Sequence, residues 1–417
     1  MFNSTICTQL IAFGSTRNLS PPGSVSFVNC PFPTLTEDAV PVADVTIGES
    51  CPEPYTTHSL FNISGMSYGA ISKPAILALS HGARMSGCWV STGEGGADIV
   101  YQEGADKYGV RDAKGELSDT RLKALGAVEQ IKMFEIKLSQ GAKPGRGGIF
   151  PAEKVCKEIA IIRGIPEGQD SISPNRHEDI ADNYDLIDII VLIRNVTGKP
   201  VGFKAVLGGG GWLDQLFARI QERGAECAPD FITLDGADGG TGAAPQSLMD
   251  YMGLPLKQSL PLLVDKLNEY GLKGRVKVVA SGKLITPSEM AWALCIGANF
   301  VTSARGFMFS LGCIQALQCN KNTCPTGIAT HSKRLQRELD VTDKSERVKN
   351  YALNMAYEVC VIAHSCGVKE PRQLTRDHAK VMLDKGLAVP LNELHPDVVP
   401  VSTSETPAEA LKIRASS

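Results

Sequence analysis

The sequence lacks the features that mark several large classes of protein. No apolar run reaches the length of about 20 residues that a membrane-spanning helix needs. The formal net charge at pH 7 is −3, so no basic excess predicts a nucleic-acid or membrane partner. Twelve cysteines in 417 residues are too sparse for a disulfide scaffold. We therefore expect a sizeable apolar core, no nucleic-acid and no membrane partner, and a cytoplasmic location.

The N-terminus shows no targeting signal. Its opening stretch, MFNSTICTQLIAFGSTRN, has a short apolar run, but no basic region precedes it and no clear small-residue cleavage site follows. We expect this stretch to belong to the mature protein. Residues 1–59 are rich in Pro, Ser and Thr, and we expect them to form an irregular N-terminal extension that packs on the core.

From Phe61 onward, short apolar runs that end in Gly or polar residues alternate with helical stretches. This alternation over about 250 residues predicts an α/β fold, a (β/α)8 TIM barrel. A doubly wound open sheet is the alternative. The predicted strands are 61–66, 88–92, 132–139, 171–173, 201–206, 231–236, 276–282 and 300–304. The predicted helices are 72–84, 152–162, 178–196, 212–223, 257–270 and 286–297.

The chain is thus divided into three parts. The barrel is expected over residues 60–335, after the extension of residues 1–59 and before a C-terminal helical tail over 336–417. Within the tail, 345–385 are predicted to be helical. Within the barrel, TPSEM (286–290) is typical of a helix start, with Thr286 as the cap.

Three cysteines, Cys313, Cys319 and Cys324, lie close together in the stretch 311–330. Structural zinc sites need a fourth ligand, and of the nearby residues only His331 could provide one. Three thiolates from one loop suit an iron–sulfur cluster better, either a three-iron cluster or a four-iron cluster with an open corner. Zinc and free thiols remain the alternatives.

Three glycine-rich segments follow predicted strands, at 234–245, 280–284 and 303–307. In a barrel, the loops after the last strands commonly bind a phosphate through backbone N–H groups. The segments therefore favour a phosphate-bearing cofactor such as FMN over simple tight turns. The glycines of KAVLGGGGW (204–212) do not have dinucleotide-binding spacing, and we reject a Rossmann site there.

Two lysines interrupt apolar strands. Lys204 lies in VGFKAV, and Lys137 lies in FEIKLSQGAKPG. Each side chain either extends outward to solvent or faces the site, where it would place a cation beside a flavin.

Five motifs together resemble the FMN-binding synthase domain of glutamate synthases in order and spacing. They are SYGAISKPA (67–75), STGEGG (91–96), EIKLSQGAKPGRGG (135–148), DGADGGTGAAP (235–245) and LGCIQALQCNKNTCPTGIAT (311–330). The resemblance covers about residues 60–335. Both ends of the chain are similar to a stand-alone branch of that family.

The resemblance implies a TIM barrel with FMN at its C-terminal mouth and a [3Fe-4S] cluster on Cys313, Cys319 and Cys324. It implies reduction of 2-iminoglutarate, formed from 2-oxoglutarate and ammonia, to L-glutamate. Electrons would come from ferredoxin or a reductase subunit and pass through the cluster to FMN. The division is chemically sensible, because the cluster carries one electron and the imine needs two.

The resemblance also assigns residues. Lys204, Lys143 and Gln140 match the substrate and flavin side of the catalytic site. The implied cofactor-binding residues are Met66, Ser67, Ser91, Thr92, Gly93, Lys137, Lys204, Asp238, Gly239, Gly240, Thr241, Gly282, Lys283, Ala304 and Arg305.

The chain departs from the family pattern in two places. We expect no glutaminase domain, and Arg146 stands where glutaminase-coupled members are typically acidic. Free ammonia, an amine or a separate amidotransferase subunit would then supply the nitrogen. The lysine strand continues into Ala205 and the four glycines Gly208–Gly211, where we expect substrate identity to be decided. The alternatives are an N-methylglutamate synthase-type subunit, a flavoenzyme for another 2-oxo acid, or a non-catalytic electron-transfer subunit.

Overall fold

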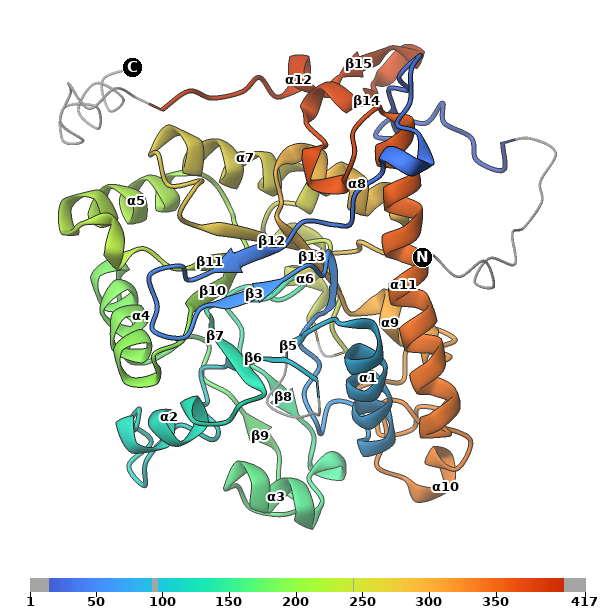
Figure 1. Ribbon diagram of the computed structural model, residues 1–417. Helices are drawn as coiled ribbons and strands as arrows, with labels where there is room; N and C mark the ends of the chain where they lie inside the picture. The colour runs from blue at the N-terminus through green and yellow to red at the C-terminus, as the bar shows by residue number, and fades with distance from the viewer. Residues whose placement is uncertain (1–14, 92–96, 243, 401–417) are drawn as a thin grey trace.

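Eight parallel strands close into a barrel in this computed structural model, which describes residues 15–91, 97–242 and 244–400 (Figure 1). The last barrel strand pairs with the first, Val301 with Phe61. The predicted TIM barrel is therefore confirmed, and the open-sheet alternative is wrong. The barrel strands are β4 (Phe61–Ile63), β5 (Val90–Ser91), β6 (Ile99–Glu103), β7 (Ile131–Lys137), β10 (Val201–Ala205), β11 (Phe231–Asp235), β12 (Lys277–Ser281) and β13 (Phe300–Ser303).

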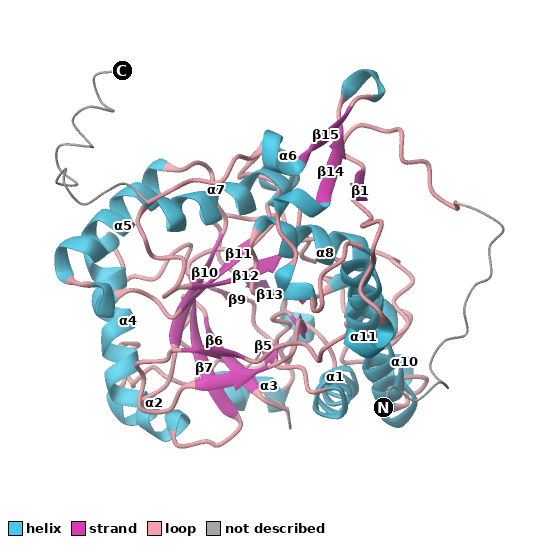
Figure 2. Ribbon diagram, turned by 45° about the horizontal axis from the view of Figure 1, so that its top comes forward, coloured by secondary structure: helices cyan, strands magenta, loops and turns pink. Residues whose placement is uncertain are grey.

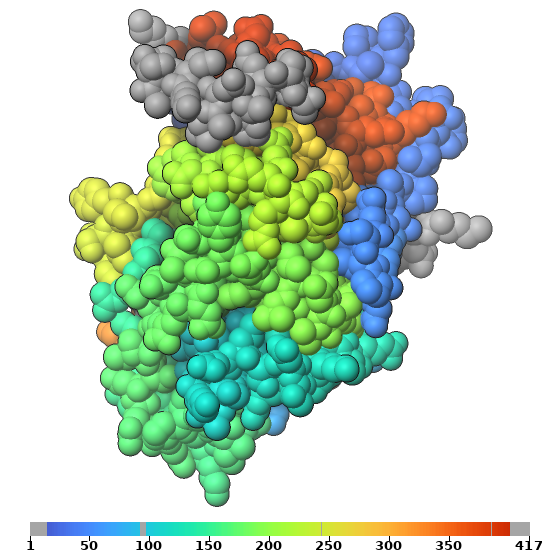
Figure 3. All heavy atoms as spheres, turned by 90° about the vertical axis from the view of Figure 1, so that its left-hand side faces the viewer, coloured from blue at the N-terminus to red at the C-terminus, as the bar shows by residue number. Residues whose placement is uncertain are grey.

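Helices surround the strands (Figure 2). On the side where α4 and α5 lie, their side chains cover the barrel wall (Figure 3). Within the described residues, no helix is both long and apolar enough to cross a bilayer. The helices are α1 (Lys73–Ser86), α2 (Asp119–Gly126), α3 (Lys157–Arg163), α4 (Asn183–Thr197), α5 (Gly211–Arg223), α6 (Gln246–Tyr251), α7 (Leu256–Glu269), α8 (Pro287–Ile296), α9 (Arg305–Ser310), α10 (Lys333–Gln336), α11 (Val341–Ser365) and α12 (Leu391–Leu394).

Helix α8 shows how local sequence sets an element's ends. The Thr286 side chain accepts a hydrogen bond from the Glu289 backbone, and the Glu289 side chain accepts one from the Thr286 backbone. Pro287 stands at the first helical position, where no N–H is needed. The helix stops at Gly297, whose φ of +120° is a conformation that L side chains rarely adopt. The predicted capping box is confirmed.

Side chains alternate along the strands, so the barrel interior is layered from bottom to top. Apolar residues such as Met133 and Phe231 fill the N-terminal end. Two positions further along the same strands, Glu135 and Thr233 are polar and hydrogen-bonded to each other. Charged residues follow at the C-terminal end, so chemistry is confined to that end.

A hairpin closes the bottom of the barrel. Strands β2 (Val45–Ile47) and β3 (Tyr55–Thr57) pair antiparallel, and Ile47 and Tyr55 join the apolar cluster at that end. The Tyr55 ring packs edge-on against Trp89, with the centroids 6.2 Å apart. Residues 1–59 were predicted to be irregular, but part of this stretch forms the β2–β3 hairpin, which plugs the N-terminal end of the barrel.

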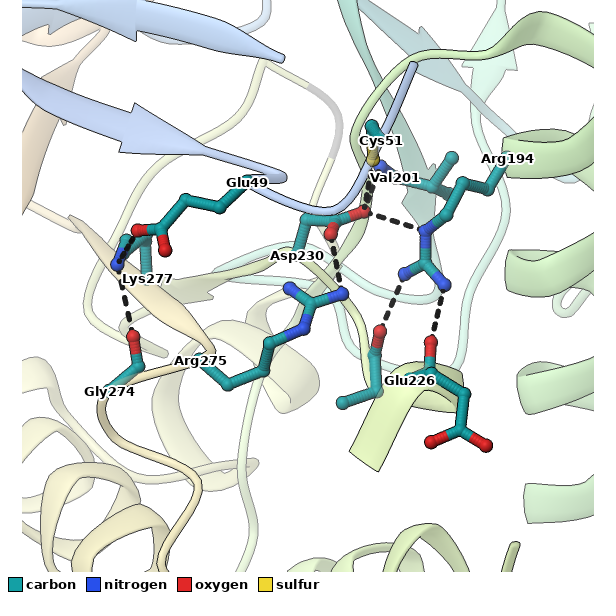
Figure 4. Close-up of polar contacts among 10 residues, drawn as sticks. Glu49, Cys51, Arg194, Val201, Glu226, Asp230, Gly274, Arg275 and Lys277 are labelled. Carbon is teal, nitrogen blue, oxygen red and sulfur yellow. Dashed lines mark hydrogen bonds and ion pairs between the residues drawn. The ribbon is translucent and has the colours of Figure 1, made fainter. Parts of the chain in front are cut away.

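A buried ion-pair network also lies at the bottom of the barrel (Figure 4). Asp230 is fully buried immediately before β11. Its carboxylate lies 2.9 Å from Arg194 Nε and 2.7 Å from Arg275 Nη2. The Val201 backbone N–H donates to the same carboxylate at 2.8 Å. The network joins the starts of β10 and β11 to α4.

The two ends of the described chain meet. Strand β14 (Ala379–Met382) pairs antiparallel with both β1 (Val25–Phe27) and β15 (Ala388–Pro390). Helix α11 packs along α1 (Figure 1). The helical prediction for 345–385 is correct up to Ser365 and wrong beyond it, because residues 379–382 are held extended by β1.

One predicted barrel strand was misplaced. Strand β9 (Ser171–Ile172) pairs antiparallel with β8 (Ile149–Phe150) outside the barrel. The strand that takes this place in the barrel is β6 (IVYQE), which was not predicted and which pairs with β5 and β7. Only residues 92–98 lie between β5 and β6, which is too short a connection for the regular alternation of strands and helices, so the alternation rule could not find it. The bounds of the three predicted segments stay a prediction, although the barrel strands do fall between Phe61 and Ser303.

Candidate active site

A cavity of about 1190 Å³ opens at the C-terminal end of the barrel strands. Among its described charged lining residues, basic ones outnumber acidic ones by nine to four, which favours anionic ligands. The acidic lining residues are Asp106, Asp235, Asp238 and Asp250. The basic lining residues are Lys137, Lys143, Arg146, Lys154, Arg163, Arg176, Lys204, Lys283 and Arg305.

A fixed ion pair lies at the floor of the cavity. Lys204 Nζ is 3.3 Å from Asp235 Oδ2, and both side chains are buried. Asp235 also accepts hydrogen bonds from Gly141 N at 2.8 Å and from Ser281 Oγ at 2.7 Å. Burial raises the pKa of Asp235, but Lys204 and these donors outweigh it, so the pKa lies below its usual range. Lys204 is therefore held by a carboxylate that stays ionised.

Lys137 lines the same cavity from the neighbouring strand, where it pairs in register with Lys204. Burial and the charges of Lys204 and Lys143 lower its pKa to about 8, although Asp235 and Glu135 oppose the shift. An ammonium with such a pKa can release a proton near neutral pH. Of the two orientations that the sequence left open, both lysines take the inward one.

The loop after β7 closes over this floor. A Cβ at Gly141 would lie 2.4 Å from the Gly236 carbonyl oxygen, so only glycine lets the two loops approach this closely. Lys143 is buried, and its Nζ lies 3.5 Å from the Gly147 carbonyl oxygen. Gln140 lines the cavity, and Arg146 lines it from an exposed position.

Glycines and one arginine form the adjoining part of the cavity wall. A Cβ at Gly240 would lie 2.7 Å from Arg305 Nη2, and Gly282, at φ +127°, lies against the backbone of Gly236. Because these positions lack side chains, the Arg305 guanidinium can lie against the backbone at Gly240, and the loops at Gly236 and Gly282 can pack closely. Other predicted residues on this wall are Asp238, Gly239, Thr241, Lys283 and Ala304.

The three cysteines of the stretch 311–330 line the rim of the same cavity. Burial and the thiols of Cys324 and Cys313 raise the pKa of Cys319. Burial also acts to raise the pKa of Cys324, but hydrogen bonds from Thr326 and from nearby backbone N–H groups leave it below its usual value. Among the described residues, no three His, Cys, Asp or Glu side chains converge as closely as a single metal ion needs.

Sequence reasoning missed a cation beside these thiols. Lys154 is 2% exposed, and its Nζ donates to the Cys319 carbonyl at 2.7 Å and to the Ala70 carbonyl at 2.9 Å. Burial lowers the pKa of Lys154 below its usual value, although the thiols of Cys319 and Cys324 act in the opposite direction. The second missed residue is Asp235. It could have been found from the sequence, because it is a carboxylate at the end of an apolar strand.

Not all of the predicted site residues line the cavity. Met66 and Ser67 line the cavity, but Ser91 is buried in β5 and does not. Thr92 and Gly93 lie outside the described residues. None of Gly208–Gly211 lines the cavity, and the run lies between the end of β10 and the first residue of α5. The cavity lining gives no support to the expectation that these glycines decide the substrate, and that expectation stays a prediction.

A profile described as a conserved region in glutamate synthase matches residues 34–369. The chain belongs to the glutamate synthase family. Among its relatives in that family, the glutamate synthase large subunit-like protein YerD of Bacillus subtilis is 41% identical over 84% of this chain. The archaeal-type glutamate synthase [NADPH] of Thermotoga maritima is 34% identical over 78% of it. This chain covers 68% of the first relative and 62% of the second.

Solved structures outside the glutamate synthase family share the fold. A flavocytochrome b2 variant with sulfite bound aligns with a TM-score of 0.52 at 12% identity, over 88% of this chain and 78% of that one. A mandelate oxidase variant with 2-hydroxy-phenylacetamide aligns with a TM-score of 0.50 at 14% identity, over 86% of each chain. At such identities the likeness concerns the fold alone.

Proposed function

We propose that this chain acts as a glutamate synthase-type oxidoreductase that uses FMN and an iron–sulfur cluster to reduce the imine of a 2-oxo acid. One observation carries the proposal. A single cavity brings together the Lys204–Asp235 pair, the glycine-lined wall and the three cysteines of 311–330. A flavin and a cluster would then lie within one site, as electron transfer between them requires.

The cavity fits FMN. Its volume of about 1190 Å³ is ample for a flavin nucleotide. Gly239, Gly240, Gly282 and Arg305 all line it, so backbone N–H groups and the guanidinium could together hold a phosphate there. On the other side, Lys137 and Lys204 would face the ring.

The cysteine loop fits a cluster better than a single zinc ion. Three thiols line one rim, but they do not converge on one ion position. The hydrogen bonds to the Cys324 sulfur stabilise its thiolate, which is the form that binds iron. A [3Fe-4S] cluster matches three ligands, and a [4Fe-4S] cluster with an open corner would also match.

When bound, the cluster would supply single electrons and FMN would supply the hydride that reduces the imine carbon. The chain's own residues set the surroundings of that step. Asp235 keeps Lys204 fixed at the floor, where the lysine can stabilise negative charge. Lys137 holds a proton that its lowered pKa allows it to donate to the amine nitrogen.

The basic lining favours a substrate with two carboxylates, such as 2-oxoglutarate, with ammonia as the nitrogen source. An amine or a separate amidotransferase subunit could replace free ammonia. Ferredoxin or a reductase subunit would deliver electrons at the cysteine rim, where Ile314 is 67% and Leu317 is 81% exposed. A cytoplasmic location belongs to the same proposal.

The test is anaerobic reconstitution of the full chain, with FMN, iron and sulfide measured per chain. The flavin is then reduced with dithionite and mixed with 2-oxoglutarate plus ammonium. We expect reoxidation of the flavin with formation of L-glutamate. Reoxidation only with methylamine would identify an N-methylglutamate synthase-type subunit, and reoxidation with neither amine would reject imine reduction.

A variant tests the site itself. Lys204→Met should slow reoxidation about 100-fold, because it removes the fixed cation, while iron per chain stays at the wild-type level. Lys321→Met, which changes an exposed lysine of the cysteine loop, is the control and should react at the wild-type rate. Equal rates for Lys204→Met and wild type would remove Lys204 from the mechanism.

A further inference from the structure

Lys154 is a buried cation that ties the cysteine loop to the barrel. It ends the short turn Ala152–Lys154 after β8. Its Nζ donates to the carbonyls of Ala70 and Cys319, at 2.9 and 2.7 Å. Next to it, the Glu153 carbonyl accepts a hydrogen bond from Asn322 Nδ2 at 2.7 Å. Two consecutive residues of this turn therefore hold the cysteine loop at Cys319 and at Asn322.

No carboxylate in the part of the chain that the structure describes balances this charge. Among the described residues, no Asp or Glu oxygen lies within 4.0 Å of Lys154 Nζ. The buried cations Lys204, Arg194 and Arg376, by contrast, each pair with an aspartate. A buried ammonium without a counter-charge costs several kcal/mol, so an anionic group is expected beside it.

Two thiols and one imidazole of the described residues interact electrostatically with Lys154. Cys319 and Cys324 both interact electrostatically with its ammonium. His331 also faces it, but its Nε2 lies 2.8 Å from the Gly69 carbonyl oxygen and provides no negative charge. The anion that would complement Lys154 is therefore located at the thiols.

We propose that Lys154 is a positioning residue that places a fixed positive charge beside the iron–sulfur cluster and favours the cluster's reduced state. This inference rests on the proposed function, since it needs a cluster on the three cysteines. Reduction adds one negative charge to the cluster, and a nearby cation in a low-dielectric environment stabilises that charge. Lys154 would thereby ease the entry of each electron from the donor.

The test compares Lys154→Met with Lys154→Arg in the full reconstituted chain. The ratio of reduced to oxidised cluster is measured at fixed potentials by electron paramagnetic resonance. In Lys154→Met we expect this ratio to fall about tenfold, which corresponds to about 59 mV for one electron. Lys154→Arg should stay within about twofold of wild type because it keeps the charge. Lys321→Met, an exposed lysine of the same loop, should not change the ratio.

Iron content and the thermal midpoint of the cluster-free chain separate the other outcomes. Full iron with an unchanged ratio in Lys154→Met would overturn the proposal. If Lys154→Met loses the cluster while Lys154→Arg keeps it, and the thermal midpoint of the cluster-free chain is unchanged, the proposal is supported. If both variants lose the cluster and the thermal midpoint falls, Lys154 has a structural role and the proposal is overturned. A wild-type chain that binds no iron would instead reject the proposed function.

Discussion

Glu103 is a carboxyl group that the barrel wall buries without a full set of partners. It ends β6, 4% exposed, and its Oε2 has no hydrogen-bond partner among the described residues. Burial raises its pKa from 4.5 to about 8, although Lys107 acts in the opposite direction. Because the neighbouring Gln102 lines the cavity and side chains alternate, Glu103 faces the helix layer.

We predict that Glu103 makes the protein less stable as the pH rises. Between about pH 4.5 and 8 the folded state binds the proton and the unfolded state releases it, so the free energy of unfolding falls through this window. The slope is at most about 1.4 kcal/mol per pH unit. Glu103→Gln should flatten this fall, as measured by thermal midpoints across the window. Exposed Glu167→Gln is the control, and parallel curves for Glu103→Gln and wild type would contradict the assignment.

Individual residues were only partly predictable. Side chains alternate between the two faces of a strand, so the sequence VGFKAV places Lys204 and Phe203 on opposite faces, and the structure agrees. This could be predicted because the alternation depends only on neighbouring residues. The partner of Lys204 was not predictable, since Asp235 reaches it from another strand. Lys154 was missed for the same reason, because its contact with Cys319 spans 165 positions.

At the scale of elements, the packing of α1 against α11 depends on one small residue. A Cβ at Gly82 in α1 would lie 2.4 Å from Val348 Cγ1 and 2.8 Å from the Ser345 carbonyl oxygen of α11. The helices can approach this closely only because Gly82 has no side chain.

Gly82→Ala should therefore destabilise the protein by about 1–3 kcal/mol, although Ala is the better helix former. The matched control is Gly211→Ala at the start of α5, where a Cβ meets nothing within 4 Å. It should be neutral or stabilising, and it should leave the Michaelis constant for substrate unchanged. Chemical denaturation measures both variants, and a stabilised Gly82→Ala would show that the helices can separate without cost.

Elements with strong local signals were predicted, and those that depend on distant partners were not. Helix α8 has its cap, proline and terminal glycine within a dozen residues. By contrast, 379–382 has a helical pattern, but it forms a strand because β1 pairs with it. Strand β9 was placed in the barrel because three residues cannot show which partner they pair with.

At the scale of the molecule, stability and chemistry are placed at opposite ends of the barrel. The Asp230 network and the β2–β3 plug lie at the N-terminal end, and the cavity lies at the C-terminal end. Changes at the two ends should therefore have separate effects.

Asp230→Asn should cost about 3–5 kcal/mol of unfolding free energy, because it leaves the buried Arg194 and the partly exposed Arg275 without their counter-charge. The kcat of the folded fraction should not change. Glu49→Gln, at the exposed ion pair with Lys277, is the control and should cost less than about 1 kcal/mol. Thermal unfolding and activity corrected for folded fraction measure both, and a lowered kcat in Asp230→Asn would show coupling between the ends.

The pairing of α1 with α11 has a consequence during synthesis. Residues 87–340 separate the two helices in the chain, so a ribosome adding about 5–20 residues per second completes α11 on the order of ten to fifty seconds after α1. Throughout that interval the apolar side chains of α1 that face α11 have no native cover. A nascent chain of this protein would be most vulnerable to aggregation through its first barrel helix, and it would lose that vulnerability only as its last long helix emerges.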